Sequence, residues 1–141
     1  YKSKQFRCEA PTGWRMIENQ GGAQRASFFG PPNGPAPFSA SIAVYFYGPG
    51  SNFSSPREYW AAKAGSGPGA LLRESEGRQE FSKTTVLPPL HGKAGGPVRE
   101  EYVLVPGKGG FYALVLSAPE KAIDGSRPAF RALVDSFKPG T

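Results

Sequence analysis

The sequence predicts an α+β fold in which helices flank a central, mainly antiparallel sheet. Residues 111–117 are apolar on both alternating faces, which is typical of an inner strand covered on both sides. The Ala118-Pro119 pair should break that strand. An apolar stripe at helical spacing then follows, formed by Phe130, Leu133, Val134 and Phe137. The stripe predicts an amphipathic helix over residues 126–137 that packs on the sheet.

Length and composition indicate one ordinary globular domain. A chain of 141 residues matches a single domain over 1–141 and is long enough to bury an apolar core without disulfides or metal. The 19 glycines and 15 prolines approach the level at which chains stay disordered, but an aromatic share of 13% supplies the apolar area that disordered chains lack. The glycines and prolines are therefore expected in loops.

Cysteine and histidine usage excludes the common zinc clusters. The single cysteine, Cys8, cannot form an internal disulfide, and with one histidine no thiolate or mixed cluster can assemble. Cys8 is expected to be a small, buried apolar residue. No apolar run approaches the length of a membrane span, and the chain begins at Tyr1 rather than methionine. This start favours a processed protein whose export signal has been removed. A cytosolic protein is the alternative interpretation.

The net charge of +6 raises nucleic acid or an anionic surface as a partner. The lysines and arginines are scattered from Lys2 to Lys138 and interleaved with acids, and no window gathers a basic cluster. This distribution favours a soluble basic surface and predicts no nucleic-acid binding.

Four extended segments are predicted in the first half of the chain, at residues 6–10, 13–18, 26–30 and 39–47. Pro11 ends the first, and the proline-rich segment 31–37 cannot support a sheet ladder, so it should be a loop. In the fourth, apolar side chains fall on both alternating faces, which predicts burial on both sides.

A helix is predicted to start at Ser55. Ser55 can cap the helix, Pro56 suits its first position, and Glu58 can complete a capping box. Gly65 can end it, and residues 66–69 then form a linker.

The second half should hold two further extended segments and the final helix. Residues 71–87 and 98–105 are expected to be extended, and residues 106–110 should join the second of these to the central strand as a hairpin. Asp124 or Ser126 should cap the main part of the last helix, with Pro128 inside its first turn.

His91 is the only candidate for catalysis. A hydrolase triad needs a base, and His91 is the only histidine, but it lies in a predicted loop and no Gly-x-Ser-x-Gly elbow accompanies it. A loop histidine is the favoured interpretation, and a metal role would need carboxylates brought in by folding. We therefore predict no catalytic, cofactor-binding or metal residue.

Two other motifs have structural explanations. Glu100 and Glu101 look like a catalytic carboxylate pair, but neighbours on a strand point to opposite faces. One is expected in solvent and the other paired with a nearby Arg or Lys. The glycine-rich segment 65–69 follows a helix, and its Pro68 lacks the N–H that a phosphate cradle uses, so a linker is favoured.

Residues 108–115 faintly echo an RNA-recognition strand, but a glycine stands where that motif needs an aromatic residue. A packed strand is the favoured interpretation. Asn52-Phe53-Ser54 is a formal glycosylation acceptor, relevant only in a secreted protein.

The order of motifs along most of the chain resembles the PsbP-like family. The matching positions are residues 6–14, Gly92, 99–102, 110–114, 118–121 and 134–137. The resemblance implies an α/β/α sandwich with an antiparallel sheet. Photosynthetic members are extrinsic lumenal subunits that help maintain the oxygen-evolving centre of photosystem II, and bacterial relatives are envelope lipoproteins or periplasmic proteins. None is an enzyme by its fold, and no site residue carries over.

These implications lead to an expected function. The chain should be a non-catalytic, extracytoplasmic binding or accessory protein of the periplasm, cell envelope or thylakoid lumen, without a cofactor. A protein partner is expected, as is peripheral membrane association through an anchor preceding the chain, and the oligomeric state stays open. The alternatives are a photosystem II-associated subunit and a small hydrolase or metal-dependent enzyme using His91.

Overall fold

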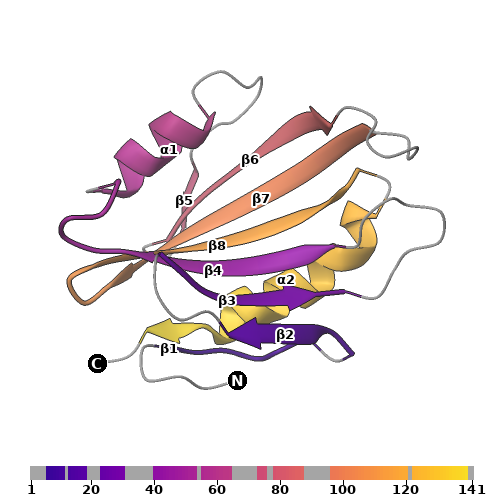
Figure 1. Ribbon diagram of the computed structural model, residues 1–141, viewed down its shortest axis with the longest axis horizontal. Helices are drawn as coiled ribbons and strands as arrows, with labels where there is room; N and C mark the ends of the chain where they lie inside the picture. The colour runs from indigo at the N-terminus through magenta and orange to yellow at the C-terminus, as the bar shows by residue number, and fades with distance from the viewer. Residues whose placement is uncertain are drawn as a thin grey trace.

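A computed structural model describes residues 6–11, 13–18, 23–30, 40–53, 55–64, 73–75, 78–87, 96–120 and 122–139. Figure 1 shows the arrangement of their helices and strands. The strands are β1 (Phe6–Arg7), β2 (Arg15–Glu18), β3 (Gln24–Phe29), β4 (Ser41–Tyr47), β5 (Arg73–Ser75), β6 (Arg78–Leu87), β7 (Gly96–Gly107), β8 (Gly110–Pro119) and β9 (Lys138–Pro139). The helices are α1 (Pro56–Ala64) and α2 (Ile123–Ser136).

Seven of these strands form one antiparallel sheet in the order β2-β3-β4-β8-β7-β6-β5. The chain builds β2, β3 and β4 as a meander, passes through α1 to the far edge, and returns as a second meander. That return places β8 beside β4, and this pairing joins the two meanders at the centre of the sheet. The predicted class, an α+β sandwich with a mainly antiparallel sheet, is confirmed.

Strand β8 is the central strand, as its apolar sequence predicted. Residues 111–116 are all buried, and β8 pairs with β4 on one side and β7 on the other. The expected break at Ala118-Pro119 is wrong, because the strand runs through both residues and Pro119 pairs with Val98. Proline is tolerated there because the ladder ends at that point. The next N–H, from Glu120, donates to the carbonyl of Pro97 over 3.0 Å.

Helix α2 buries the predicted apolar stripe but starts earlier than expected. Phe130, Leu133, Val134 and Phe137 are at most 3% exposed, although Phe137 lies just beyond the helix end. Capping by Asp124 or Ser126 was the wrong prediction, since Ala122 is the N-cap and makes no side-chain cap bond. The hydroxyl of Ser126 donates to the Ala122 carbonyl over 3.1 Å. A backbone turn from Pro119 to Ala122 therefore fixes the start, and Pro128 falls inside the helix rather than in its first turn.

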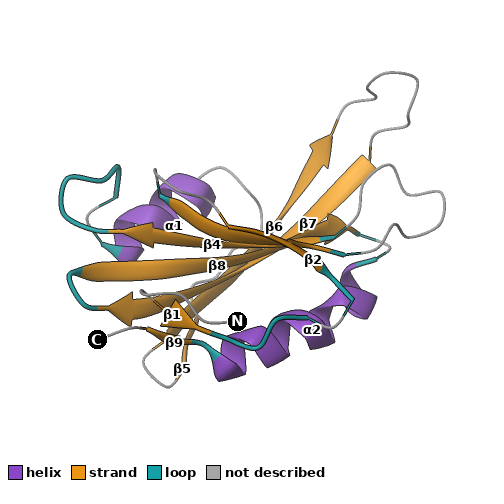
Figure 2. Ribbon diagram, turned by 60° about the horizontal axis from the view of Figure 1, so that its bottom comes forward, coloured by secondary structure: helices purple, strands orange, loops and turns teal. Residues whose placement is uncertain are grey.

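The two helices cover opposite faces of the sheet, as Figure 2 shows with the sheet between them. Alternation along β7 and β8 divides the core accordingly. On the α2 face, Val103, Val105, Leu114 and Leu116 pack with the helix stripe. On the α1 face lies an aromatic cluster of Tyr47, Tyr59, Phe81, Tyr102 and Phe111, together with Leu104, Ala113 and Val115. This arrangement gives three layers.

Helix α1 begins as predicted. The Glu58 N–H donates to the Ser55 hydroxyl over 3.2 Å, which satisfies one of the unpaired donors at the helix start. Tyr59 is 1% exposed and anchors the helix on the sheet. Its ring lies 5.0–6.4 Å from the rings of Tyr47, Phe53, Phe81, Tyr102 and Phe111. The predicted end at Gly65 and the linker 66–69 lie outside the described residues.

The N-terminal segment pairs with the end of the chain. β1 pairs with β9, and the Phe6 ring stacks on that of Phe137 with 5.3 Å between centroids. The predicted strand 6–10 is therefore cut to two residues, although Cys8 is buried as expected. Burial of Phe6 between Phe137 and Tyr112 directs this segment to the α2 face.

The predicted hairpin at residues 106–110 is confirmed. Gly107 pairs with Gly110, and Gly109 has a φ of 78°, a conformation that favours glycine. A Cβ on Gly110 would lie 2.1 Å from the Tyr47 carbonyl oxygen, so the sheet requires glycine there. The described residues of the predicted segment 71–87 are extended and form two strands, β5 and β6. The predicted proline-rich loop 31–37 lies outside the described residues.

Candidate ligand-binding cleft

A polar cleft of about 180 Å³ opens between β6, β7 and the first half of α2. Its lining residues are Glu80, Phe81, Ser82, Arg99, Glu101, Tyr102 and Arg127. The volume is enough for several waters or for the end of a side chain. Within the described part of the chain, this is the concave site in which charged side chains from several elements meet.

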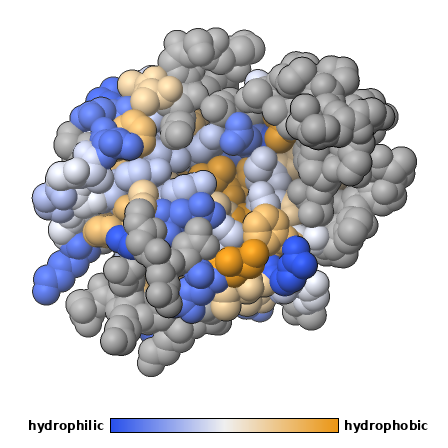
Figure 3. Space-filling model, in the orientation of Figure 1, coloured by the Kyte–Doolittle hydropathy of each residue, from blue (hydrophilic) through white to orange (hydrophobic). Residues whose placement is uncertain are grey.

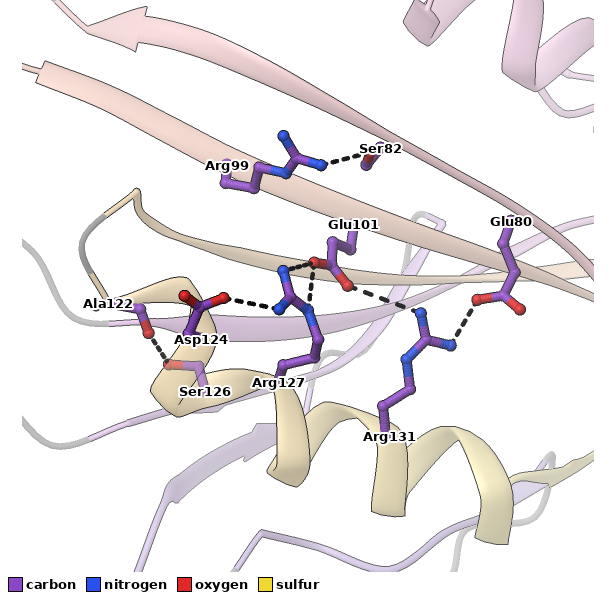
Figure 4. A network of polar contacts seen from close by, with 9 residues as sticks. All are labelled: Glu80, Ser82, Arg99, Glu101, Ala122, Asp124, Ser126, Arg127 and Arg131. Atoms are coloured by element: carbon purple, nitrogen blue, oxygen red, sulfur yellow. Dashed lines mark hydrogen bonds and ion pairs between the residues drawn. The ribbon is translucent and has the colours of Figure 1, made fainter. Parts of the chain in front are cut away.

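Strand register brings the charged residues onto one face. Ser82 lies directly opposite Glu101, and Glu80 and Arg99 lie two residues from these on their own strands. Side chains two residues apart on a strand share a face, so all four project toward α2. Arg127 and Arg131, four residues apart on α2, share a side of the helix and meet these strands. Figure 4 shows the resulting network.

Glu101 is the centre of the network and is 7% exposed. Arg127 donates to Glu101 Oε2 from Nε over 2.8 Å, and its Nη2 lies 2.6 Å from the same oxygen. Arg131 Nη2 lies 3.8 Å from Oε1. The hydrogen bond to Glu101 raises the pKa of the Arg127 guanidinium, so it stays charged. Two guanidinium groups thus compensate one buried carboxylate.

The other carboxylates are also engaged by the helix arginines. Arg131 Nη1 donates to Glu80 Oε1 over 2.5 Å, and Arg127 Nη1 donates to Asp124 Oδ1 over 2.8 Å. The Asp124 side chain is 87% exposed, so its pair with Arg127 is screened by solvent. Arg127 and Arg131 therefore account for all three acids of the network.

Arg99 differs from these two arginines. Its Nη2 donates to the Ser82 hydroxyl over 3.1 Å, and Ser82 is uncharged. Its Nε is buried and has no hydrogen-bond partner among the described residues. No carboxylate within the described ranges lies in ion-pair distance of Arg99. Arg99 therefore contacts a neutral hydroxyl, whereas Arg127 and Arg131 contact carboxylates. The three arginines together balance the charge of Glu80, Glu101 and Asp124.

The prediction for the two adjacent glutamates is correct in part. They do point to opposite faces, and Glu101 is paired with arginine, as expected. Glu100 is half-buried rather than free in solvent, and it accepts a hydrogen bond from the Tyr102 hydroxyl over 3.0 Å. Burial raises the pKa of Tyr102 and Tyr59 above the usual range for a phenol, so both stay neutral on the α1 face.

The remaining sequence candidates do not converge on this cleft. His91 and the glycine-rich segment 65–69 lie outside the described residues. Phe111 and Tyr112 are 2% and 4% exposed, which confirms the packed-strand interpretation of residues 108–115. Asn52 is exposed. No group of three or more His, Cys, Asp or Glu side chains is placed to hold a metal ion within the described ranges.

The face shown in Figure 3 is largely hydrophilic, with smaller apolar areas between. The large apolar side chains exposed in the described ranges are Met16 and Ile17 on β2, at 39% and 47%. No helix among the described segments is long and apolar enough to cross a membrane.

The chemistry of the cleft suits binding. The hydroxyl of Ser82 accepts from a guanidinium, which has no lone pair to serve as a base, and no hydrogen bond from this hydroxyl to a base is seen in the part of the chain that the structure describes. Arg99 offers unused donors to an oxygen-bearing group. Sequence analysis missed this site, although the i, i+4 spacing of Arg127 and Arg131 beside the buried stripe was a usable signal.

No protein-family model and no curated protein matches the sequence. Two solved structures are similar in fold. LpqN, described as involved in cell envelope biogenesis of Mycobacterium tuberculosis, aligns with a TM-score of 0.59 at 13% identity over 96% of this chain and 83% of its own. Cyanobacterial PsbP (CyanoP) of Synechocystis sp. PCC 6803 aligns with a TM-score of 0.54 at 12% identity over 98% of this chain and 94% of its own. Taken with the sheet order and the two flanking helices, these likenesses show that the chain has the PsbP-like fold.

Proposed function

We propose that the protein is a non-catalytic binding or accessory module that works outside the cytoplasm. The fold is shared with a protein involved in cell envelope biogenesis and with a cyanobacterial PsbP, which supports a role of this class.

The observation that carries the proposal is the state of the charged groups in the cleft. Glu80 and Glu101 are both held in ion pairs with the helix arginines, whereas a general acid or base must be free to exchange a proton with a substrate. Ser82 accepts a hydrogen bond from Arg99, and no hydrogen bond from its hydroxyl to a base is seen among the described residues. A cleft lined by paired charges and hydrogen-bond donors is suited to recognising a polar group of a partner.

The test is fractionation and crosslinking in the source organism. A C-terminally tagged precursor, expressed from its own locus, is expected in the envelope or extracytoplasmic fraction, with a discrete crosslinked protein partner. Recovery of the protein and its partner in the cytosol would contradict the proposal.

The fold likeness to cyanobacterial PsbP favours photosystem association as a second candidate within the same class. It predicts co-purification with thylakoid membranes and release by a salt wash, because a chain of net charge +6 would bind an anionic surface largely through screened charges. Retention at high salt would argue against this mode of attachment.

An enzyme using His91 is the candidate from another class. The purified protein is expected to show no esterase, phosphatase or peptidase activity. Any activity that is found in the wild type and lost in His91→Ala would replace the binding proposal with an enzymatic one.

A further inference from the structure

We propose that the outer edge of β2 binds an extended segment of a partner protein, which adds to the sheet as an antiparallel strand of the pattern basic-apolar-apolar-acidic. The inference rests on the proposed function, because it takes the partner to be a protein. It names where that partner binds and the chemistry of the bound segment, and it does not depend on the cleft beside α2.

Strand β2 (Figure 1) is an edge of the seven-stranded sheet, with β3 on one side and none of the described strands on the other. All four residues of Arg15–Glu18 are exposed, and their pairing with β3 is regular, without the bulge or proline that blocks many natural edges. Such an edge presents backbone N–H and C=O groups at every second residue. An extended polypeptide is the ligand that matches these groups, as in other complexes formed by strand addition.

The hydrogen bonds of β3 show which backbone groups of β2 face outward. Gly30, directly after β3, donates its N–H over 2.9 Å to the carbonyl of the residue directly before β4. Backbone groups alternate in direction along a strand, so Phe29 bonds toward β2, where its register partner is Arg15. By the same alternation, the N–H and C=O groups of Met16 and Glu18 point away from the sheet and are available to an added strand.

The side chains of β2 add apolar area to this edge. The large apolar side chains exposed in the described ranges, Met16 at 39% and Ile17 at 47%, both lie on this strand. Met16 lies opposite Phe28, which belongs to the core on the α2 face, so Ile17 lies on the α1 face. The other edge strand, β5, consists of Arg, Glu and Ser and has no apolar residue. An added strand would therefore bury apolar area on both faces at β2 but not at β5.

The charges at the two ends of β2 define the sequence of the bound segment. Arg15 and Glu18 are exposed, and neither makes an ion pair with another described residue. Opposite charges directly across two strands are stabilising, and like charges are destabilising. An antiparallel strand with an acid opposite Arg15, a base opposite Glu18 and apolar residues between them reads basic-apolar-apolar-acidic from its N-terminus.

A second copy of this chain does not supply that match. Residues directly opposite one another in an antiparallel pair share a face, and a two-fold axis between two β2 strands keeps every residue on its own face of the joined sheet. Arg15 and Glu18 lie on opposite faces, because three positions separate them. Arg15 of one copy therefore cannot lie opposite Glu18 of the other. A segment of a different protein can match both charges.

The experiment titrates the purified full chain with two blocked peptides of equal composition and is read by backbone amide NMR. One peptide contains Lys-Val-Val-Glu between threonines, and the other contains Glu-Val-Val-Lys in the same frame. The amide signals of Met16 and Glu18 should shift saturably, with at least about threefold tighter binding of the first peptide. Hydrogen exchange at these two amides should slow on binding, whereas the Ile17 amide, which already faces β3, should change little.

Three variants separate recognition from folding. Exchanging the two charges in the double variant Arg15→Glu, Glu18→Arg should reverse the peptide preference. Met16→Pro removes an outward N–H, which an edge strand tolerates, and should weaken binding at least about tenfold. Arg57→Gln, which removes a charge from an exposed position on α1, should bind within about twofold of wild type. Amide spectra of each free variant check that it remains folded.

The inference fails if the shifts rise linearly without saturation, if wild type binds the two peptides equally, or if the charge-exchanged variant keeps the wild-type preference. It also fails if folded Met16→Pro binds like wild type. Concentration-dependent protection of the Met16 and Glu18 amides without peptide would make a second copy the occupant instead. The titration uses the purified chain, so a cytosolic location would contradict the proposed function without altering this result.

Discussion

The two faces of the sheet are covered by different kinds of side chains. The α2 face is built mainly from aliphatic and phenylalanine side chains, together with Tyr112 and Cys8, under a helix of 14 residues, with charged groups at its rim. The α1 face is built largely from aromatic side chains under a helix of nine residues, and the hydroxyls of its three buried tyrosines lie inside the cluster. The α2 face can therefore present charges to a partner, whereas the α1 face uses its hydroxyls internally. Four predictions test this contrast, beginning with the largest expected effect.

Phe130→Ala should destabilise the protein by about 3–5 kcal/mol, because a fully buried ring is lost from the longer helix. Tyr59→Ala is expected to cost less in global unfolding, since release of the short helix α1 leaves the rest of the sheet and α2 in place. Urea unfolding measures the global change, and hydrogen exchange detects local release of α1. The exposed control Asp135→Ala should stay within about 0.5 kcal/mol of wild type. Equal global costs for Phe130→Ala and Tyr59→Ala would remove the distinction between the faces.

Glu101→Gln should destabilise the protein by about 1–2 kcal/mol, which is less than for a fully buried ion pair because Arg127 and Arg131 are partly exposed. The matched control is Asp124→Asn, whose side chain is mostly solvated and should cost at most about 0.5 kcal/mol. Thermal unfolding at low and high salt measures both. If the two variants behave alike, the buried carboxylate does not hold α2 on the sheet.

Tyr102→Phe should cost about 1 kcal/mol, since it removes the hydroxyl that donates to Glu100 and keeps the ring. Glu100→Gln retains an oxygen acceptor and should cost less. Denaturant titration of both variants measures the hydrogen bond on the α1 face. If Tyr102→Phe has a higher free energy of unfolding than wild type, the Tyr102 hydroxyl destabilises this face.

The smallest effect is a pH dependence from Cys8 on the α2 face. Burial raises the pKa of the Cys8 thiol from 9.0 to about 11, so the folded state favours the neutral thiol. Below about pH 9 both states hold the proton and the contribution is constant. Between about pH 9 and about pH 11 the unfolded state loses the proton first, so stability falls as pH rises.

Urea unfolding of wild type and Cys8→Ala at pH 8 and pH 10 isolates this slope, because the tyrosines titrate in both proteins. The wild type is expected to lose more stability than Cys8→Ala between these two conditions. Parallel losses would mean that the thiol is not protected by burial.

Local sequence patterns predicted the parts of the fold that depend on one segment at a time. The apolar run of β8, the buried stripe of α2, the Ser55 cap and the hairpin at Gly109 each follow from side-chain spacing or backbone preference. The errors have two sources, a local turn and a contact with a distant segment. The start of α2 is set by the turn from Pro119 to Ala122, and β1 is shortened because Phe6 packs on Phe137.

The cleft could not be predicted in the same way. Its charged residues come from β6, β7 and α2, and Arg131 lies 51 residues from Glu80 in sequence. Strand register and helix placement bring them together, and neither is encoded by any one segment.

The sequence by itself determined which segments are strands and helices and which of their faces are apolar, because periodicity records burial directly. Only the tertiary structure decided which charges are paired with one another. Pairing of charges depends on distances between segments remote in the chain, and at Arg99 those distances leave donors unused.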